Sequence, residues 1–170
     1  MEFKDKKRFL LTAALPYANG RLHIGHVAGA YLPADELTRF LRLKGREVHL
    51  ICGSDENGAP ITFSALKEGL SPQDIVDRYH REILDAFSGM GIAFDVYSRT
   101  HTPRHARVTQ DFFRRLYERG HIVKKTGEQV YCTVCNRFLP DRYIEGICHY
   151  PDCRAPGARG DQCEKCGRPV

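Results

Sequence analysis

From Leu10 onward, the chain has a short apolar run, a break and a long periodic run. The apolar residues that start at Leu10 are few enough for one buried strand, and Pro16 interrupts them. Asn19-Gly20 is a dipeptide typical of tight turns, and a long amphipathic segment begins at Ile24. This pattern predicts a strand, a tight loop and the start of a helix.

Residues Ile24–Lys44 carry apolar side chains every three or four positions, which is the period of a helix that packs on one side. Pro33 lies inside this run, and we expect it to kink the helix because proline has no N–H to donate. Gly45 ends the run, and Glu47–Cys52 is apolar enough for a buried strand. A strand, a helix of this length and a second strand predict a right-handed parallel βαβ unit.

Four further segments follow with recognisable boundary signals. Pro60–Glu68 is expected to form a short helix, and residues 71–90 a long one that Ser-Pro opens. Phe94–Ser98 alternates as a third strand does, and residues 102–118 form another helix. We expect the apolar stripe of this last helix to lie in the core; it consists of Val108, Phe112, Phe113, Leu116 and Tyr117. The predicted fold class is α/β, a parallel sheet with flanking helices.

The helical period disappears from Gly120 onward. Short β-like pieces replace it at Ile122–Lys124 and Gln129–Tyr131, and a cysteine-rich tail follows. The sequence therefore predicts a domain boundary here, with one domain over residues 1–119 and a small irregular one over residues 120–170.

Composition restricts the classes of function only weakly. The 170 residues carry a formal net charge of +5, which permits a nucleic-acid partner without requiring one. The sequence has no run of the roughly eighteen apolar residues that a membrane span needs, and its N-terminus lacks a signal-peptide profile. We therefore expect a cytoplasmic protein with no membrane partner. Six of the seven cysteines follow residue 130, four of them in Cys-x-x-Cys pairs, which favours metal over disulfides.

Two histidines mark the start of the long amphipathic segment. His23 and His26 are three residues apart, so they share one face of the helix start, with Gly25 between them. A helix N-terminus offers free backbone amides and a partial positive charge, and imidazole donors would complete a phosphate site there. Because Gly25 has no side chain, a flat base could lie against its backbone. The alternative is that the pair only decorates the helix surface.

Asp55 follows the second predicted strand, in a polar loop between Gly53 and Gly58. Ligands of parallel sheets gather at the carboxyl ends of the strands, so we expect Asp55 and the histidine loop to share a pocket. A carboxylate in this position could hold the ammonium group of an amino acid. The alternative is an aspartate that only caps its own loop. Cys52 stands apart from the other cysteines and is interpreted as a small buried hydrophobe.

The cysteine-rich tail predicts a structural metal centre. Four thiolates around a tetrahedral Zn2+ form a closed site with no open position for catalysis, and the predicted ligands are Cys148, Cys153, Cys163 and Cys166. The pair Cys132 and Cys135 is a further half-site. This pair could instead join Cys148 and Cys153, or it could bind a second zinc with a cysteine pair further along a longer chain.

Three segments of the chain have family counterparts. His-Ile-Gly-His at 23–26, preceded by Ala-Leu-Pro-Tyr-Ala-Asn-Gly, resembles the ATP-binding signature of the class I aminoacyl-tRNA synthetases. Gly-Ser-Asp-Glu-Asn-Gly at 53–58 and the cysteine-rich tail are similar to segments of the methionyl-tRNA synthetases, and this resemblance covers Arg8–Gly167. The resemblance implies that residues 1–119 are the N-terminal half of a Rossmann-like catalytic domain. It also implies that residues 120–170 are an incomplete zinc-knuckle insertion.

The same resemblance implies a reaction and its site residues. Methionine would react with ATP, accompanied by Mg2+, to form methionyl-adenylate, and the methionyl group would then pass to tRNA(Met). The residues implied to bind ATP are His23, Gly25 and His26, and the two histidines would be the catalytic donors. The residues implied to bind methionine are Leu15, Tyr17 and Asp55.

The second signature of this family, a Lys-Met-Ser-Lys-Ser loop, does not occur in the sequence, nor does a helical anticodon-binding domain. We therefore expect a fragment of a longer enzyme that is inactive alone. One alternative is a non-catalytic, synthetase-derived module that binds zinc and tRNA, although such a module would not need the histidine motif or Asp55. Another is a small nucleotidyltransferase with a similar histidine signature, which would not explain the cysteine pairs.

Overall fold

Residues 7–127, 129–140, 143–160 and 162–169 are described by the structure, a computed structural model. The chain divides into two compact units, Met1–Arg119 and Gly120–Val170. Among the described residues, no helix combines the length and the apolar character needed to cross a membrane.

The first unit is built on a parallel sheet. Its strands are β1 (Arg8–Thr12), β2 (Glu47–Ser54) and β3 (Val96–Arg99), and they lie in the order β1-β2-β3. Every β1 residue pairs with a β2 residue, from Arg8 opposite Glu47 to Thr12 opposite Ile51. The carboxyl half of β2 pairs with β3, with Ile51 opposite Val96. The predicted α/β class, a parallel sheet with flanking helices, is confirmed.

The connection from β1 to β2 is helical but not one regular helix. It consists of α1 (Ile24–His26), the π-helical segment η1 (Val27–Tyr31) and α2 (Leu32–Leu43). The N–H of Leu32 donates to the carbonyl of Val27, five residues back, as in a π-helix. Pro33 then lies in the first turn of α2, where a missing N–H costs little. The predicted interruption is present, but it takes the form of a π-helical turn before the proline.

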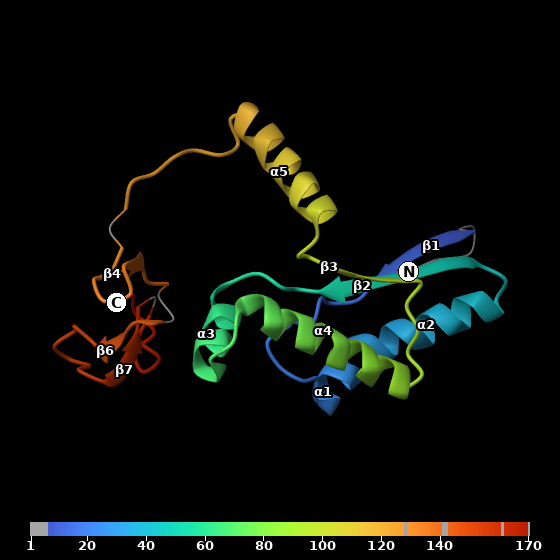
Figure 1. Ribbon diagram of the computed structural model, residues 1–170, viewed down its shortest axis with the longest axis horizontal. Helices are drawn as coiled ribbons and strands as arrows, with labels where there is room; N and C mark the ends of the chain where they lie inside the picture. Colours follow the sequence, from blue (N-terminus) through green and yellow to red (C-terminus); the bar gives the residue numbers. More distant parts are fainter. Residues whose placement is uncertain (1–6, 128, 141–142, 161, 170) are drawn as a thin grey trace. The chain divides into compact units, whose positions relative to one another are not determined.

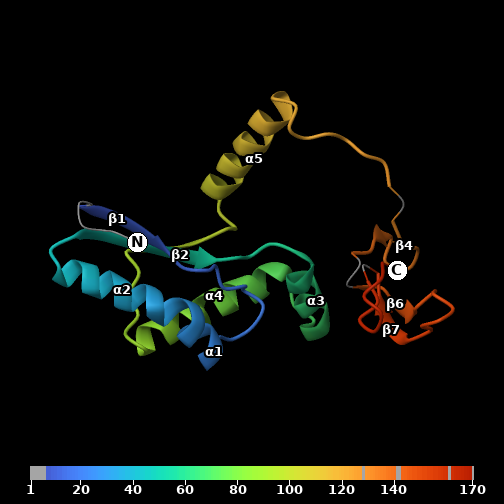
Figure 2. The ribbon, with the colours of Figure 1, turned by 180° about the vertical axis from the view of Figure 1, so that it is seen from behind.

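The connection from β2 to β3 contains α3 (Ala59–Glu68) and α4 (Pro72–Gly89). Ser71 caps α4 through its hydroxyl group, which accepts from the N–H of Asp74 at 3.1 Å, as the sequence predicts. Both views of the ribbon show α2 and α4 on the same side of the sheet (Figures 1 and 2). Right-handed crossovers explain this arrangement, because both steps across the sheet go in the same direction.

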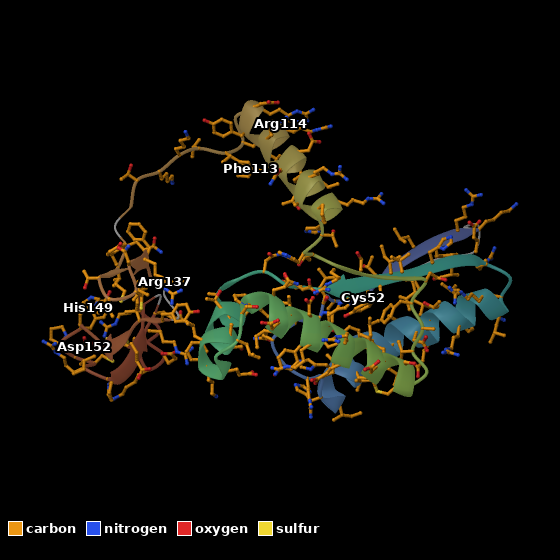
Figure 3. The ribbon with its side chains drawn as sticks, viewed as in Figure 1. Cys52, Phe113, Arg114, Arg137, His149 and Asp152 are labelled. Atoms are coloured by element: carbon orange, nitrogen blue, oxygen red, sulfur yellow. The ribbon has the colours of Figure 1, made fainter. Side chains whose placement is uncertain are left out.

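An aromatic and aliphatic core lies between these helices and the sheet. Its buried members are Val27, Tyr31, Cys52, Ile83, Phe87 and Ile92. The Phe87 ring packs edge-on against Tyr31, Phe94 and Tyr97, with centroids 4.7, 5.1 and 5.7 Å away. Cys52 lies on β2 (Figure 3), and burial raises the pKa of its thiol, which fits a small hydrophobe and not a nucleophile.

Helix α5 (Pro103–Glu118) begins where predicted, and its N-cap Thr102 accepts from the N–H of His105 at 3.1 Å. The prediction that its apolar stripe lies in the core is wrong, because no residue of this helix is buried. Phe112 is 64% exposed, and Phe113, labelled in Figure 3 beside the charged Arg114, is 57% exposed. The helical spacing of the apolar residues correctly predicted an apolar face on α5. No described element of the chain covers it.

The second unit contains two short antiparallel hairpins. They pair β4 (Tyr131–Cys132) with β5 (Arg137–Phe138), and β6 (Glu145–Ile147) with β7 (Pro156–Arg159). Residues 122–124 form no strand, so that prediction is wrong, and the strand predicted from Gln129 begins only at Tyr131. The buried cluster of this unit consists of Cys148, Ala155, Ala158 and Cys163. Small residues and thiols thus take the place of large apolar side chains.

Candidate active site and candidate metal centre

The two histidines form a reciprocal cap at the start of α1. The Nδ1 atom of His23 accepts from the N–H groups of Gly25 and His26, at 3.1 and 3.3 Å. In return, the Nδ1 atom of His26 accepts from the N–H of His23 at 3.2 Å. The two rings stack with centroids 3.6 Å apart and an interplanar angle of 20°. The expectation that they share one face is therefore met.

This cap fixes where the imidazole protons lie. A ring nitrogen that accepts a hydrogen bond carries no proton, so each neutral imidazole holds its proton on Nε2. Both Nε2–H groups are then donors for a ligand. The expectation of free helix amides is wrong for Gly25 and His26, because their N–H groups are already bonded to His23. The free donors that these two residues offer at this helix start are therefore side-chain groups.

Gly25 is required by the histidine cap, and its contact with a flat base stays a prediction. A Cβ atom on Gly25 would meet Cε1 and Nδ1 of His23 at 3.0 and 3.1 Å. The glycine therefore gives room to the His23 ring. The bare backbone at this position is a requirement of the histidine cap.

Replacement of Gly25 by alanine is expected to displace the His23 ring and weaken the cap. Gly29→Ala is the matched control, since a Cβ there would meet nothing within 4 Å. We expect Gly25→Ala to alter the ring NMR signals of both histidines, while Gly29→Ala leaves them unchanged. Identical ring NMR signals in the two variants would contradict this role.

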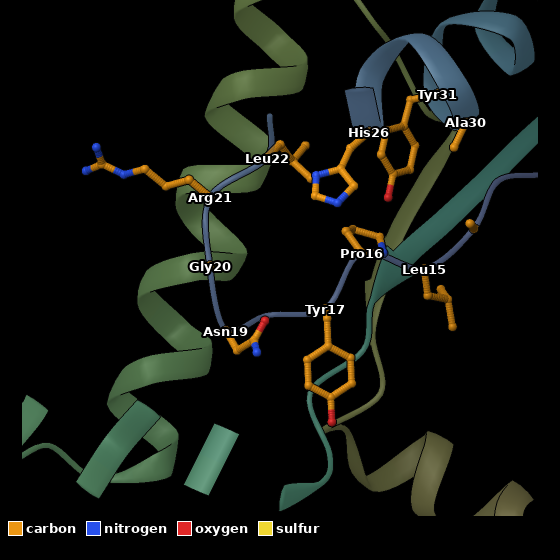
Figure 4. A pocket seen from close by; sticks show the side chains of 11 residues that line it. Leu15, Pro16, Tyr17, Asn19, Gly20, Arg21, Leu22, His26, Ala30 and Tyr31 are labelled. Carbon is orange, nitrogen blue, oxygen red and sulfur yellow. The ribbon is translucent and has the colours of Figure 1, made fainter. Parts of the chain in front are cut away.

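A cavity of about 350 Å³ lies between the carboxyl end of β1 and the first helical turns. Three of the predicted site residues line it, namely Leu15, Tyr17 and His26; His23, Gly25 and Asp55 do not. Figure 4 shows the hydroxyl group of Tyr31 pointing from the helix toward Pro16. Tyr31 was not among the predicted site residues, because its place in the periodic apolar run at 24–44 indicates the packed face of a helix. Burial raises the pKa of Tyr31 to about 12, so it is a neutral donor.

Asp55 lies beside this cavity through its backbone. Its N–H donates to the carbonyl of Pro16 at 2.8 Å, and its carbonyl accepts from the N–H of Ala18 at 2.9 Å. The Asp55 carboxylate is half-buried, and its hydrogen bond from the N–H of Asn57 is long, at 3.4 Å. This bond supports the alternative in which Asp55 caps its own loop. The length of that bond leaves the carboxylate capacity for a charged donor.

The glycines around Asp55 serve the protein's own contacts. A Cβ on Gly53 would lie 2.8 Å from the carbonyl oxygen of Ser98, so glycine allows β3 to approach β2 here. Gly58 has a φ of +123° and faces the hydroxyl group of Tyr17, which donates to the carbonyl of Asn57. Contacts within the protein therefore account for glycine at both positions.

Four cysteines of the tail converge on one point. The Sγ atoms of Cys148, Cys153, Cys163 and Cys166 all lie within 4.8 Å of one another. Two of the sulfur–sulfur distances are 3.9 and 3.8 Å. A tetrahedral zinc with Zn–S bonds of about 2.3 Å places its sulfurs about 3.8 Å apart, so the spacing fits a zinc ion. The alternative in which Cys132 and Cys135 share Cys148 and Cys153 is not the arrangement observed.

Local backbone turns bring these sulfurs together. Four residues separate Cys148 from Cys153, two more than in a Cys-x-x-Cys pair. A turn accommodates them, in which the N–H groups of Cys153 and Arg154 both bond to the carbonyl of Tyr150. In the second pair, Gly167 has a φ of +67°, and its N–H donates to the carbonyl of Cys163 at 2.7 Å. Arg168 bonds to both oxygens of Asp152, at 2.9 and 2.8 Å. Figure 3 labels Asp152 beside His149 in this unit.

The other pair forms a half-site at the β4–β5 hairpin. The N–H of Cys135 donates to Sγ of Cys132 at 3.3 Å, and this bond lowers the pKa of the Cys132 thiol. Amide-to-sulfur bonds of this kind favour the thiolate that a metal requires. Neither cysteine belongs to a group of three or more metal-ligating side chains among the described residues.

Comparison with known proteins gives three consistent results. A family model described as class I tRNA synthetases (M) matches residues 9–170. A methionine–tRNA ligase of Thermococcus kodakarensis is 56% identical over 163 residues, which are 96% of this chain and 22% of that protein. A methionine–tRNA ligase of Bacteroides fragilis is 56% identical over 164 residues, which are 96% of this chain and 24% of that protein. The chain thus spans less than a quarter of the length of these relatives.

Two solved structures share the fold. Mycobacterium tuberculosis methionyl-tRNA synthetase in complex with methionyl-adenylate is 24% identical and has a TM-score of 0.73, covering 96% of this chain and 30% of that one. A LeuRS of Agrobacterium radiobacter K84, in a ternary complex with tRNA and LeuAMS, is also 24% identical and has a TM-score of 0.70, covering 92% of this chain and 20% of that one.

Proposed function

Because the chain belongs to the class I tRNA synthetases (M), we propose that it supplies one wall of the active site of a methionine–tRNA ligase. The observation that carries the proposal is the histidine cap, which leaves two Nε2–H donors. One belongs to His26, which lines the cavity at the end of β1, and the other to His23, whose ring stacks on that of His26. The high identity to methionine–tRNA ligases over 96% of the chain supports methionine as the amino acid.

The proposed reaction needs positioning and charge stabilisation more than proton transfer. The methionine carboxylate attacks the α-phosphate of ATP in line, methionyl-adenylate forms and pyrophosphate leaves. The Nε2–H groups of His23 and His26 would donate to phosphate oxygens, whose charge grows in the transition state. Mg2+ would accompany the triphosphate, and the terminal adenosine of tRNA(Met) would accept the methionyl group in a second step.

Methionine itself would lie in the cavity beside the β1 loop. Leu15 and Tyr17 line that cavity and present an apolar wall to an unbranched thioether, and a sulfur beside an aromatic ring adds about 1 kcal/mol. The Asp55 carboxylate would accept from the ammonium group, because its own loop gives it only a long bond. In the second unit, the four converging cysteines would hold a structural Zn2+.

The direct test is methionine-dependent exchange of pyrophosphate into ATP. We expect the full polypeptide encoded by the gene to catalyse this exchange with methionine and far more slowly with leucine or isoleucine. Binding of zinc and tRNA without any exchange would instead favour the non-catalytic module. Exchange that is equally fast with leucine would contradict methionine as the substrate.

Residues 1–170 alone are expected to show little or no exchange. Leu15 is 52% exposed, and both histidines are exposed, so these residues face solvent and offer only one side of a site. Water competes with their donors, and electrostatic stabilisation is weak in such a setting. The check is the same exchange assay on the isolated chain and on the full polypeptide at equal concentration. Robust exchange by residues 1–170 would overturn the prediction.

A further inference from the structure

A buried polar network lies directly behind the loop that carries Asp55. Its central group is the carboxylate of Glu56, whose side chain is 0% exposed. A carboxylate so deeply buried cannot touch a substrate, and it is stable only when its oxygens are paired. The identity of its partners therefore indicates what the group does.

The Glu56 carboxylate connects three elements of the first unit. The Nε atom of Arg99 in β3 donates to both of its oxygens, at 2.7 and 2.9 Å. The hydroxyl group of Ser54, at the end of β2, donates to Oε1 at 2.7 Å. Arg99 also bonds to Asp77 in α4, with 2.5 Å between Nη2 and Oδ1.

The network assigns the proton of His80 in α4. The Nδ1 atom of His80 lies 2.7 Å from Oγ of Ser54. Because the single Ser54 proton points to the carboxylate, Oγ must accept from His80, which therefore carries its proton on Nδ1. The result is one directed chain of donors from His80 through Ser54 to Glu56. Such a chain holds only one arrangement of the loop.

The backbone around Asp55 is fixed by the same group of residues. The hydroxyl oxygen of Thr100 accepts from the N–H of Glu56 at 2.8 Å and from the side-chain amide of Asn57 at 3.0 Å. The N–H of Thr100 donates to the carbonyl of Ser54 at 3.1 Å. The residues on both sides of Asp55 are thus anchored, while its own carboxylate stays half-buried.

We propose that Glu56 is a positioning residue that fixes Asp55 for the substrate ammonium group through its bonds to Arg99 and Ser54. This inference rests on the proposed role of Asp55 and adds the structure that holds it in place. Glu56 acts only through the loop that carries Asp55. Loss of Glu56 is therefore expected to raise KM for methionine and to leave KM for ATP nearly unchanged.

The test compares Glu56→Gln with Glu68→Gln in the full polypeptide. Glu68 is the matched control because it pairs with Arg78 between α3 and α4, outside the loop. We expect Glu56→Gln to raise KM for methionine in the exchange assay about 10-fold or more, with KM for ATP within about twofold of the unmodified protein. Equal KM values for methionine in the two variants, or a matching rise in KM for ATP, would overturn the proposal.

Backbone amide hydrogen exchange separates this proposal from the proposed function. Glu56→Gln is expected to speed exchange at residues 54–58 at least about 10-fold relative to Glu68→Gln, whether or not the protein activates methionine. If the unmodified protein lacks activity, the proposed function fails, and the amide data still decide whether Glu56 fixes the loop. Unchanged exchange at residues 54–58 would refute the positioning role.

A second pair of variants tests the proposal even if the Glu56→Gln protein does not fold. Thr100→Val keeps the shape of the side chain and removes the oxygen that accepts from Glu56 and Asn57, whereas Thr100→Ser keeps that oxygen. We expect Thr100→Val to raise KM for methionine and to speed amide exchange in the loop, and Thr100→Ser to restore both. Identical behaviour of the two variants would count against the proposal.

Discussion

Replacement of His26 by alanine is expected to lower the rate of methionine-dependent ATP–pyrophosphate exchange about 100- to 1,000-fold, with little change in KM for methionine. The substitution removes an Nε2–H donor aimed at charge that develops in the transition state, and the loss of one such donor typically has this size. His23→Ala is expected to reduce the rate similarly. It removes the partner that accepts from the N–H groups of Gly25 and His26.

His26→Asn separates the two roles of the ring. The asparagine oxygen can replace Nδ1 as the acceptor for the N–H of His23, but no donor then stands at the place of Nε2. We expect this variant to keep the stability of the unmodified protein and to remain as slow as His26→Ala. His49→Ala, at an exposed histidine on β2, is the control that should retain full activity. Exchange by His26→Ala at the rate of the unmodified protein would contradict the role of the histidines as donors to phosphate oxygens.

Removal of zinc is expected to unfold residues 120–170 and to leave the first unit folded. The buried cluster of the second unit consists of two cysteines and two alanines, so bonds to the proposed zinc would supply most of its stability. Structural zinc in small domains contributes about 10–16 kcal/mol of folding free energy. A chelator should therefore abolish the protected amides of β6 and β7, while those of β1 to β3 persist.

Cys163→Ser and Cys135→Ser form a matched pair for this prediction. Cys163 belongs to the four-sulfur cluster and is buried, whereas Cys135 is exposed and lies outside it. Elemental analysis should find at least one zinc per chain in the unmodified protein and in Cys135→Ser, and a loss of one zinc in Cys163→Ser. A content below one zinc in the unmodified chain would refute the metal centre.

Local sequence signals predicted most elements of the first unit. Ser71 and Thr102 were recognisable as N-caps because their capping bonds are made within three residues. The sequence predicted a disturbed helix at Pro33 but not a π-helical turn, because the missing N–H of proline does not determine how the helix backbone adjusts. The apolar stripe of α5 was assigned to the core from its period alone, and a period does not reveal what covers a face.

The candidate site was predictable in its residue types and less so in its contacts. The spacing of His23 and His26 indicated one shared face, but the reciprocal cap depends on ring rotations that a sequence does not encode. Glu56 and His80 were not recognised, because they are 24 residues apart in sequence and meet only when α4 packs on β2. The position of Glu56 beside Asp55 was the one available signal.

The order of the strands has a consequence for the cavity at the end of β1. Both crossovers step away from β1, so β1 is an edge strand of the described sheet, and α5 leaves β3 on the side opposite to α2 and α4 in both views of the ribbon (Figures 1 and 2). A later strand that joined the sheet at β1 by a right-handed crossover would need its helix on that opposite side. The cavity would then lie at a topological switch point, where helices diverge to the two faces of the sheet and open a crevice for a ligand.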